Sequence, residues 1–404
     1  MPYPFPSLPA DMAYVGILFG LFVVPRALQR FGVPAAITSL LLGAIVGLGF
    51  GVLQHDETIH LLSSFGITAL FLFAGLEVDT SELRANAGIL TQHLVVRLIL
   101  LAACAFGLVQ VLHLEPRMAT LLALALLTPS TGFILDSLGL FGLEDGEKRW
   151  VKSKAIAAEL LALLVMFATL QSTSLEKFLV SFAVLTVLIA LLPLVFRAFA
   201  AFVVPHAPRS EFAFLLMIAL VCAIVTRELG VYYLVGAFVV GMAAQRFRER
   251  LPALASEQMV HAVEMFSSFF VPFYFFNAGL RLQREDLHPM ALAYGAVFFA
   301  VVVPVRLGAV LLHRRFALGE GHAEGMRIAV SLLPTLVFGL ALAEILRDRF
   351  AAPPELFGGV VLYTLATTLV PAFFFRRPYP DLTEPHAPEL SVAGDGGEAA
   401  DDGA

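Results

Sequence analysis

The chain has 404 residues, of which 59% are apolar and only 14% are charged. A typical soluble domain is about 45–50% apolar and about 25% charged, so this composition excludes a soluble enzyme, a disordered chain and a nucleic-acid-binding protein. The formal charge of −6 reflects the end of the chain, because seven acidic residues and no Lys or Arg follow Arg377. The two cysteines, Cys104 and Cys222, lie far apart in apolar runs, which excludes a disulfide framework or a cysteine metal site.

Apolar stretches of about 17 to 25 residues have the length that a helix needs to cross a bilayer. Thirteen such stretches predict an all-α polytopic membrane protein with 13 transmembrane helices. They are Met12–Phe31, Val33–Leu53, Ile59–Glu77, Gly88–Leu112, Met118–Phe141, Val151–Thr173, Phe178–Val203, Phe212–Gly230, Val231–Phe247, His261–Leu282, Met290–Leu312, Ala323–Leu346 and Leu356–Phe375. Because thirteen is odd, we expect the two termini on opposite sides of the membrane.

The distribution of Lys and Arg between the connecting segments predicts the orientation, because basic residues are retained on the cytoplasmic side. With the N-terminus outside, 16 basic residues fall on the cytoplasmic side and 7 on the other side. This favours a multi-pass protein of the inner (plasma) membrane with a cytoplasmic C-terminus. The first span lacks the basic flank and cleavage site of a secretory signal, so we expect it to remain in the protein.

Two pairs of similar segments indicate an internal repeat. The sequence FAGLEVDTSEL begins at Phe73 and NAGLRLQREDL begins at Asn277, and their AGL triplets are 204 residues apart. Pro129 and Pro334 lie in similar Leu-rich segments 205 residues apart. Both offsets equal seven spans, so the second copy runs in the opposite sense, which predicts two inverted six-helix repeats of the kind found in secondary transporters. Chance similarity among Leu-rich segments is the alternative for either match alone.

The two prolines predict broken helices near the bilayer centre. Pro129 is flanked by Thr128, Ser130 and Thr131, and Pro334 is followed by Thr335. The freed backbone groups need partners in the membrane, and two broken helices in matching positions can cross and present their half-helix ends to an ion. The alternative for each span alone is a simple proline kink.

The sixth span contains Glu159, with no basic residue three or four positions after it. A carboxylate at this depth is costly unless it faces a cavity, a partner or a bound cation, so Glu159 is the first candidate to bind a proton and a monovalent cation in turn. Arg306, in the eleventh span, is the candidate counter-charge, and its charge is fixed because arginine keeps its proton. Asp136 and Thr335 are weaker candidates for the ion site. We expect Asp136 either near the ion path or only at a water-filled funnel.

Other polar residues support less specific interpretations. His93 and Arg97 share a face of the fourth span and either bind backbone or brace the core; we favour bracing. His261 and Glu264 begin the tenth span, where a pH sensor is possible but a solvated helix end is favoured. The charged residues that follow the third span fit a topological feature better than a binding site; they are Glu77, Asp79, Glu82 and Arg84.

The span order, the broken helices, the membrane carboxylate and the FAGLEVDTSEL stretch together resemble the monovalent cation:proton antiporter superfamily. Within it the chain is similar to the second family, which includes bacterial sodium/proton exchangers and the membrane domain of potassium efflux antiporters. The resemblance covers Met12 to Phe375. It implies that Thr128, Ser130 and Thr131 belong to the hydroxyl-rich crossing and that Arg306 is the family's basic residue.

One position departs from the family pattern. The resemblance implies an acidic or amide residue followed by an ion-binding Asp, and by position this pair falls on Ala158 and Glu159. The first member is therefore lost and the second is longer by one methylene. We expect Glu159 to bind the ion without the usual contribution of its neighbour at position 158, together with Thr128, Ser130 and Thr131, and Arg306 to turn to Glu159 or to helix carbonyls.

The resemblance implies a secondary active antiporter that exchanges Na⁺, or K⁺ or Li⁺, for H⁺ by alternating access and serves pH homeostasis. With one titrating carboxylate and a fixed arginine we expect electroneutral exchange. We expect a homodimer in the lipid bilayer with no enzymatic activity, no cofactor, no nucleic-acid partner and no attached nucleotide-binding regulatory domain. The alternatives are an ion-binding sensor, a non-transporting homologue and an exchanger of another solute.

The expected organisation divides the chain into a membrane antiporter domain, 1–377, and a disordered acidic cytoplasmic tail, 378–404. Within the membrane domain we expect two helix bundles that move against each other during transport. The first, called the panel, comprises residues 12–85 and 208–288, and the second, called the core, comprises residues 86–173 and 289–376. The span at 178–203 is expected to link the two halves.

Overall fold

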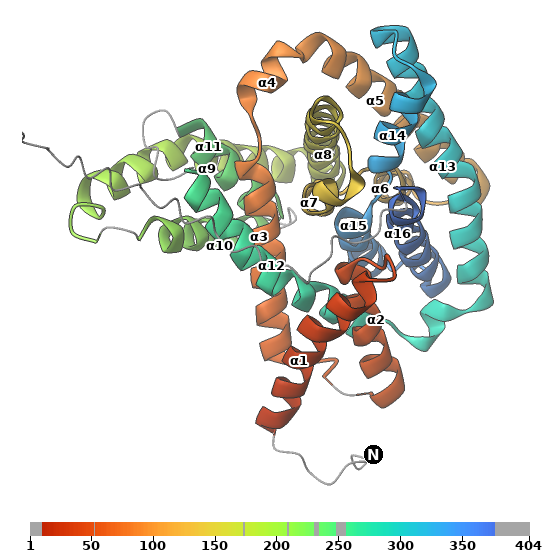
Figure 1. Cartoon of the computed structure of the whole chain (residues 1–404), viewed down its shortest axis with the longest axis horizontal. Helices are drawn as coiled ribbons and strands as arrows, with labels where there is room; N and C mark the ends of the chain where they lie inside the picture. Colours follow the sequence, from red (N-terminus) through yellow and green to blue (C-terminus); the bar gives the residue numbers. More distant parts are fainter. Residues whose placement is uncertain are drawn as a thin grey trace, which may run out of the picture.

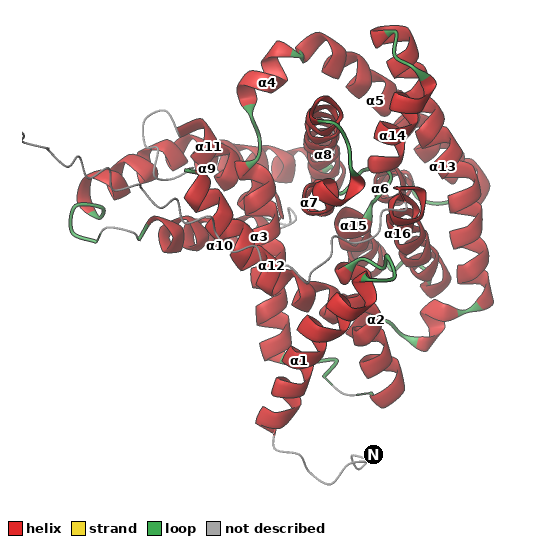
Figure 2. Cartoon of the chain, in the orientation of Figure 1, coloured by secondary structure: helices red, strands yellow, loops and turns green. Residues whose placement is uncertain are grey.

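The computed structural model describes residues 10–51, 53–172, 174–207, 210–229, 234–247 and 256–375. These residues form helices joined by short connections, with no strand among them (Figure 2). The predicted acidic tail, 378–404, lies outside the described residues. The all-α class predicted from the apolar stretches is confirmed for the part of the chain that is described.

The helices follow one another with few residues between them. In chain order they are α1 (Ala10–Gln29), α2 (Ala35–Ala44), the π-helical η1 (Ile45–Phe50), α3 (Glu57–Leu76), α4 (Thr80–Ala85), α5 (Ala87–Leu112), α6 (Pro116–Leu127), α7 (Thr131–Ser137), the 3₁₀ turn η2 (Leu138–Phe141), α8 (Asp145–Gln171), α9 (Leu175–Phe202), α10 (Glu211–Glu228), α11 (Leu234–Phe247), α12 (Glu257–Leu280), the 3₁₀ turn η4 (Arg284–Leu287), α13 (Pro289–Leu318), α14 (His322–Ser331), α15 (Leu336–Phe350) and α16 (Pro354–Phe375).

Eight helices in the described residues are long and apolar enough to cross a membrane, counting Pro116–Leu135 as one. If α14 and α15, which are bent by 46° at their break, are counted as one further span, the described residues contain up to nine spans. Shorter apolar helices cover Tyr14–Gln29, Ala35–Phe50 and Val235–Phe247. The chain is therefore a multi-pass membrane protein, as the composition predicted.

Helix α3 packs closely against α11 and α12, and α12 also packs against α2. The glycines of both AGL triplets lie at these contacts: a Cβ on Gly75 of α3 would lie 2.3 Å from the carbonyl oxygen of Phe238 in α11, and one on Gly279 of α12 would lie 2.0 Å from that of Leu40 in α2. Without a hydrophobic driving force in lipid, helices associate where small residues let their backbones approach. The repeated triplet therefore allows close helix packing at both places.

A second group of helices surrounds the α6–α7 break. Helix α16 packs against α13 and α15, and α6 packs against α5 and α15. Figure 1 shows α8, α15 and α16 nearly end-on, with α5 and α13 outside them. In the apolar 18-residue window of the α6–α7 span 89% of the residues are buried, whereas in that of α5 only 6% are buried. The broken helix is thus in the interior, screened by helices whose outer faces are apolar.

Candidate functional site

The first broken helix ends and restarts around Pro129. Helix α6 ends at Leu127, Thr128 and Ser130 have extended backbones (ψ of 125° and 98°), and α7 starts at Thr131. Proline has no N–H to continue the helix and disfavours helical geometry in the preceding residue. The interruption predicted from the proline and its hydroxyl-bearing neighbours is therefore present.

The second break, between α14 and α15, lies directly against the first. The backbone N–H of Ser130 donates to the carbonyl oxygen of Pro334 (2.8 Å), and the N–H of Val337 donates to Oγ of Ser130 (3.3 Å). Segments about 200 residues apart in sequence thus satisfy each other's freed backbone groups. We use the term crossing for residues 128–131 and 332–335.

Glu159 of α8 lies beside the crossing and is 1% exposed. Its Oε2 accepts a hydrogen bond from the backbone N–H of Thr131 (3.1 Å). Thr131 is the first residue of α7, so the carboxylate lies at the positive end of a half-helix, where negative charge is stabilised. Ala158 is also buried and offers no polar group, so Glu159 is the acid that this segment of α8 brings to the crossing.

Arg306 of α13 lies at the negative ends of the two half-helices. Its guanidinium donates to the carbonyl oxygens of Leu126 (3.2 Å) and Leu332 (2.7 Å) and to the hydroxyl of Tyr363 (3.1 Å). Leu126 is in the last turn of α6 and Leu332 follows α14, where carbonyls lack helical partners. Of the two partners expected for Arg306, the structure shows the helix carbonyls; no ion pair with Glu159 occurs among the described residues.

The remaining predicted site residues are placed around this centre. Thr128, Ser130, Thr131 and Thr335 are all buried, and Oγ1 of Thr335 hydrogen-bonds to Oγ1 of Thr367 in α16 (3.2 Å). Asp136 belongs to α7, but its side chain lies outside the described part of the structure. Among the described residues, no group of three or more His, Cys, Asp or Glu could hold a metal ion.

Sequence reasoning missed the contribution of α16. The hydroxyl of Tyr363 donates to the Leu126 carbonyl (2.6 Å) while it accepts from Arg306, so it completes the cap on the end of α6. The available signal was a polar stripe in an apolar span, because Tyr363, Thr364, Thr367 and Thr368 recur at helical spacing. All four are buried.

The charged segment after α3 makes contacts with α8. Glu77 pairs with Lys152, and Oε1 of Glu82 accepts from the Ser153 hydroxyl (2.8 Å). Asp79 caps α4, and its hydrogen bond with the Ser81 hydroxyl lowers the pKa of the Asp79 carboxyl. His261 and Glu264 are exposed at the start of α12, and Nδ1 of His261 lies 3.3 Å from Oε2 of Glu264.

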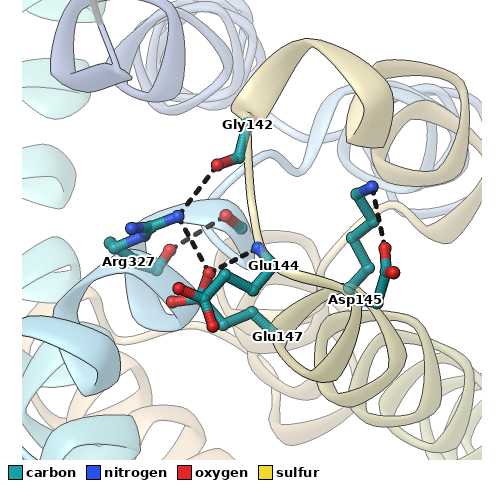
Figure 3. Close-up of polar contacts among 7 residues, drawn as sticks. Gly142, Glu144, Asp145, Glu147 and Arg327 are labelled. Atoms are coloured by element: carbon teal, nitrogen blue, oxygen red, sulfur yellow. Dashed lines mark hydrogen bonds and ion pairs between the residues drawn. The ribbon is translucent and has the colours of Figure 1, made fainter.

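The start of α8 is also tied to the second broken helix (Figure 3). Glu144 and Glu147 form a capping box that begins α8. Arg327 of α14 pairs with Glu147 (2.9 Å) and donates to the carbonyl oxygen of Gly142 (2.9 Å). This ion pair connects the helix that carries Glu159 to one half of the crossing.

The chain is similar to known ion exchangers over most of its length. The model of the sodium/hydrogen exchanger transmembrane family matches residues 17–377. A probable Na⁺/H⁺ antiporter 3 of Methanocaldococcus jannaschii is 25% identical over 372 residues, covering 88% of this chain and 92% of that protein. The Na⁺/H⁺ antiporter NhaS5 of Synechocystis is 26% identical over 84% of this chain, which spans about half (49%) of that relative's length.

The fold is similar to that of a solved exchanger. The sodium proton antiporter MjNhaP1 of Methanocaldococcus jannaschii superposes with a TM-score of 0.67 over 91% of this chain and 95% of that one, at 15% identity. The match of the family model to residues 17–377 shows that the chain belongs to the sodium/hydrogen exchanger family.

Proposed function

We propose that the protein is a secondary antiporter that exchanges Na⁺ for H⁺ by alternating access. The observation that carries the proposal is the single carboxylate of Glu159, buried at the crossing and bonded to Thr131 without a basic partner within ion-pair distance among the described residues. An ionised carboxylate in that position is stabilised by a cation, and a neutral one needs none. Proton and cation therefore compete for the same group.

The crossing supplies the further oxygen atoms that a desolvated monovalent cation needs. Thr128, Ser130 and Thr131 are buried, and the backbone N–H of Thr131 donates to Glu159. Unwound segments also present carbonyls that helices would otherwise use internally. We propose that these groups bind the cation together with Glu159, with Thr335 and Asp136 in lesser roles.

The position of Arg306 supports electroneutral exchange. Arginine does not release its proton, and Arg306 is occupied by the carbonyls of Leu126 and Leu332. The only group at the crossing that we propose to titrate is then Glu159, which exchanges one proton for one monovalent cation. We propose that Ala158 excludes a second titrating acid at this level of α8.

We propose thirteen membrane spans in two inverted halves. The eight long apolar helices and the bent α14–α15 pair, together with the shorter apolar helices α1, α2–η1 and α11 and with α10, correspond in order to the thirteen apolar stretches. The close helix contacts at both AGL triplets support the repeat. The panel is then 12–85 and 208–288, the core is 86–173 and 289–376, and α9 is the linker.

Contacts between panel and core support a rigid-body movement of one against the other. Lys152 of α8 pairs with Glu77 after α3, and at the opposite end of the helices Arg347 of α15 donates to the carbonyl oxygen of Arg281 at the end of α12 (3.0 Å). A cavity of about 340 Å³ adjoins the second contact and is lined by Leu40, Leu280 and Leu340 among others. We propose that the two contacts open alternately during transport.

The membrane orientation and oligomeric state are part of the proposal. The excess of basic residues on one side supports an inner-membrane protein with its N-terminus outside. The family resemblance supports a homodimer. Single cysteines introduced near each terminus, labelled with an impermeant reagent, test the orientation, and native electrophoresis after mild solubilisation tests the dimer.

The transport proposal is tested in proteoliposomes. Proton flux is followed with a pH-sensitive dye while Na⁺, K⁺ or Li⁺ is added, and a potential-sensitive dye is read in parallel. We expect proton release from acid-loaded vesicles on addition of Na⁺, with no membrane potential generated by the exchange. Absence of proton flux with all three ions contradicts antiport, and a transport-driven potential contradicts electroneutral exchange.

A further inference from the structure

A small cavity adjoins the crossing, between α5 and α13. Its volume is about 20 Å³, which is room for about one water molecule. The polar side chains that line it are His93 and Arg97 of α5 and Arg306 of α13, and the other described residues of its wall are apolar. Among these lining residues there is no Asp or Glu. The charged side chains of the wall are therefore both positive.

The two arginines bind consecutive carbonyls at the end of α6. Arg97 donates from one terminal nitrogen to the carbonyl oxygen of Leu127 (2.7 Å), and Arg306 donates to that of Leu126 (3.2 Å). Guanidinium groups from two helices are thus held close together at the cavity that both line. Like charges repel strongly where water is scarce, so an anion placed between them relieves the repulsion.

Each guanidinium keeps a donor nitrogen without a protein partner. Arg306 is only 5% exposed, and its Nε is buried and forms no hydrogen bond in the described structure. Arg97 donates from Nε to Nε2 of His93 (3.2 Å) and from one terminal nitrogen to Leu127, and its other terminal nitrogen has no partner among the described residues. A buried N–H without an acceptor is costly, and a guanidinium only donates. The group that fits between the arginines is therefore an acceptor.

His93 does not supply a charge that balances the arginines. Its Nε2 accepts the hydrogen bond from Nε of Arg97, and an accepting ring nitrogen carries no proton. His93 therefore orients Arg97 and leaves the net charge of the cavity wall to the two guanidinium groups.

This arginine charge exceeds what the half-helix ends require. Each helix end carries roughly half an elementary charge, so the negative ends of α6 and α14, both contacted by Arg306, offset about one of the two positive charges. Neither arginine forms an ion pair with a carboxylate among the described residues. Glu159 does not line the cavity and is bonded to the positive end of α7. A surplus of about one positive charge remains, which one monovalent anion balances.

Further basic groups lead from the cavity toward the end of α13. The His313 ring lies 5.6 Å from the His93 ring, and Nζ of the fully buried Lys154 lies 3.4 Å from Nδ1 of His313. The next residue, Arg314, pairs with Glu320, which is the carboxylate that this basic group contacts. A row of basic side chains attracts an anion and repels a cation along the same path.

We propose that the cavity is a binding site for one chloride ion, held by the guanidinium groups of Arg97 and Arg306. Charge-assisted hydrogen bonds from arginine suit a small anion, and a cavity of this size excludes an organic anion such as gluconate. The bound anion stabilises the packing of α5 and α13 against the end of α6, because it relieves the repulsion between the two arginines. Anion binding at this place does not depend on the cation exchange proposed for Glu159.

The test measures the unfolding temperature of the purified protein in detergent while chloride replaces gluconate at constant Na⁺ concentration and ionic strength. The wild type is expected to gain roughly 2–4 °C in a saturable way, and bromide is expected to act like chloride. Arg97→Gln and Arg97→Met each remove one of the two charges and are expected to lose this gain. Either variant that folds decides the result. A wild-type unfolding temperature that does not depend on chloride means that the cavity holds only water, and overturns the proposal.

Arg117 is the matched control. Its guanidinium also binds two backbone carbonyls at a helix end, those of Thr169 (3.1 Å) and Leu170 (3.2 Å) in α8, but it does not line the cavity. Arg117→Gln removes the same kind of bonds and is expected to keep the full chloride-dependent gain. An equal loss of the gain in Arg117→Gln and Arg97→Gln identifies a general effect of the salt and overturns the proposal.

Bromide locates the site directly. In crystals grown with sodium bromide, an anomalous scattering peak is expected between Arg97 and Arg306, and its absence at a bromide concentration that saturates the thermal shift contradicts the site. The chloride-dependent gain is expected to remain in Glu159→Gln. Loss of ion exchange in that variant therefore bears only on the proposed antiport, and loss of the chloride effect in Arg97→Gln bears only on the anion site.

Discussion

The backbone N–H of Thr131 donates a 3.1 Å hydrogen bond to the carboxylate of Glu159, which joins the first residue of a half-helix to the only acid that α8 places at the crossing. The bond explains how a carboxylate is tolerated at this depth without a basic partner. Thr131 begins a helix because Pro129 ends the preceding one, so the proline creates both the break and the donor that Glu159 uses. Local sequence chemistry and the proposed ion site are directly connected.

Removing Arg306 is expected to destabilise the fold more than removing Tyr363. Arg306→Gln leaves the buried carbonyls of Leu126 and Leu332 poorly satisfied, and a lost charge-assisted bond together with an unsatisfied buried group costs about 3 kcal/mol or more. Tyr363→Phe removes one neutral bond to Leu126 and is expected to cost about 1 kcal/mol. The unfolding temperature of each variant is measured in detergent by heating followed by size-exclusion chromatography. An equal decrease in unfolding temperature for the two variants contradicts the assigned role of Arg306.

The break at each proline could be predicted from the sequence because it depends on backbone chemistry. Pro129 and Pro334 have hydroxyl-bearing neighbours and lie at the observed breaks, whereas five other prolines lie inside continuous helices, so proline alone does not determine a break. An unpaired Glu159 in an apolar span indicates a site because a carboxylate at that depth needs a partner. The contact between Ser130 and Pro334 could not be predicted in detail, because it joins segments about 200 residues apart. That Arg306 binds carbonyls and not Glu159 likewise depends on tertiary placement.

Buried cations were the main difference from the sequence-based interpretation. Lys154 is one of the 16 basic residues that the orientation count places on the cytoplasmic side, yet it is fully buried, with its Nζ 3.4 Å from Nδ1 of His313. Arg97, for which bracing of the core was favoured over backbone binding, binds the Leu127 carbonyl. Charge counting assumes that basic residues near span ends contact water, and it cannot identify those that face unpaired carbonyls in the interior.

The ion pair between Glu77 and Lys152 is expected to affect the conformational equilibrium more than the stability. Both side chains are about one quarter exposed (24% and 27%), and such pairs contribute less than about 1 kcal/mol. Glu77→Gln releases one contact between panel and core, so a cysteine at Ser130, in a chain without Cys104 and Cys222, is expected to react several-fold faster with a reagent added from the cytoplasmic side.

The matched control for this prediction is Asp145→Asn. It removes the ion pair with Lys148 (3.2 Å), which lies within α8 and does not join the panel to the core (Figure 3). The cysteine is expected to keep its wild-type labelling rate in this variant. Equal acceleration by Glu77→Gln and Asp145→Asn contradicts the assignment of the Glu77 pair to the moving contact.

Asp79 is expected to stabilise α4 in a pH-dependent way. Its carboxylate accepts from the Ser81 hydroxyl and from the backbone N–H groups of Ser81 and Glu82, and its pKa is lowered below the ordinary value of 3.8 chiefly by the Ser81 hydroxyl. A lowered pKa means that the stabilisation is fully present above 3.8 and is lost as the pH falls through the lower, folded-state value. Asp79→Ala is expected to cost about 1 kcal/mol locally at neutral pH.

Hydrogen exchange of residues 80–85 measures the strength of this cap. Asp79→Ala is expected to exchange faster at neutral pH than the wild type, by roughly fivefold for a loss of about 1 kcal/mol. Ser81→Ala removes the hydroxyl but keeps the backbone donors, so its exchange rate is expected to lie between those of the wild type and Asp79→Ala. Unchanged protection in Asp79→Ala contradicts the capping role, and transport is expected to remain in both variants because Asp79 lies outside the proposed ion site.

The most direct measurement of the central claim is Na⁺-driven proton flux in proteoliposomes containing Glu159→Gln. Glutamine keeps the size of the side chain and can accept the Thr131 hydrogen bond through its amide oxygen, but it neither titrates nor carries the charge that binds a cation. We predict that this variant folds and shows no exchange at any pH, whereas Glu264→Gln, at an exposed glutamate of α12, retains wild-type flux. Wild-type exchange by folded Glu159→Gln would contradict the account.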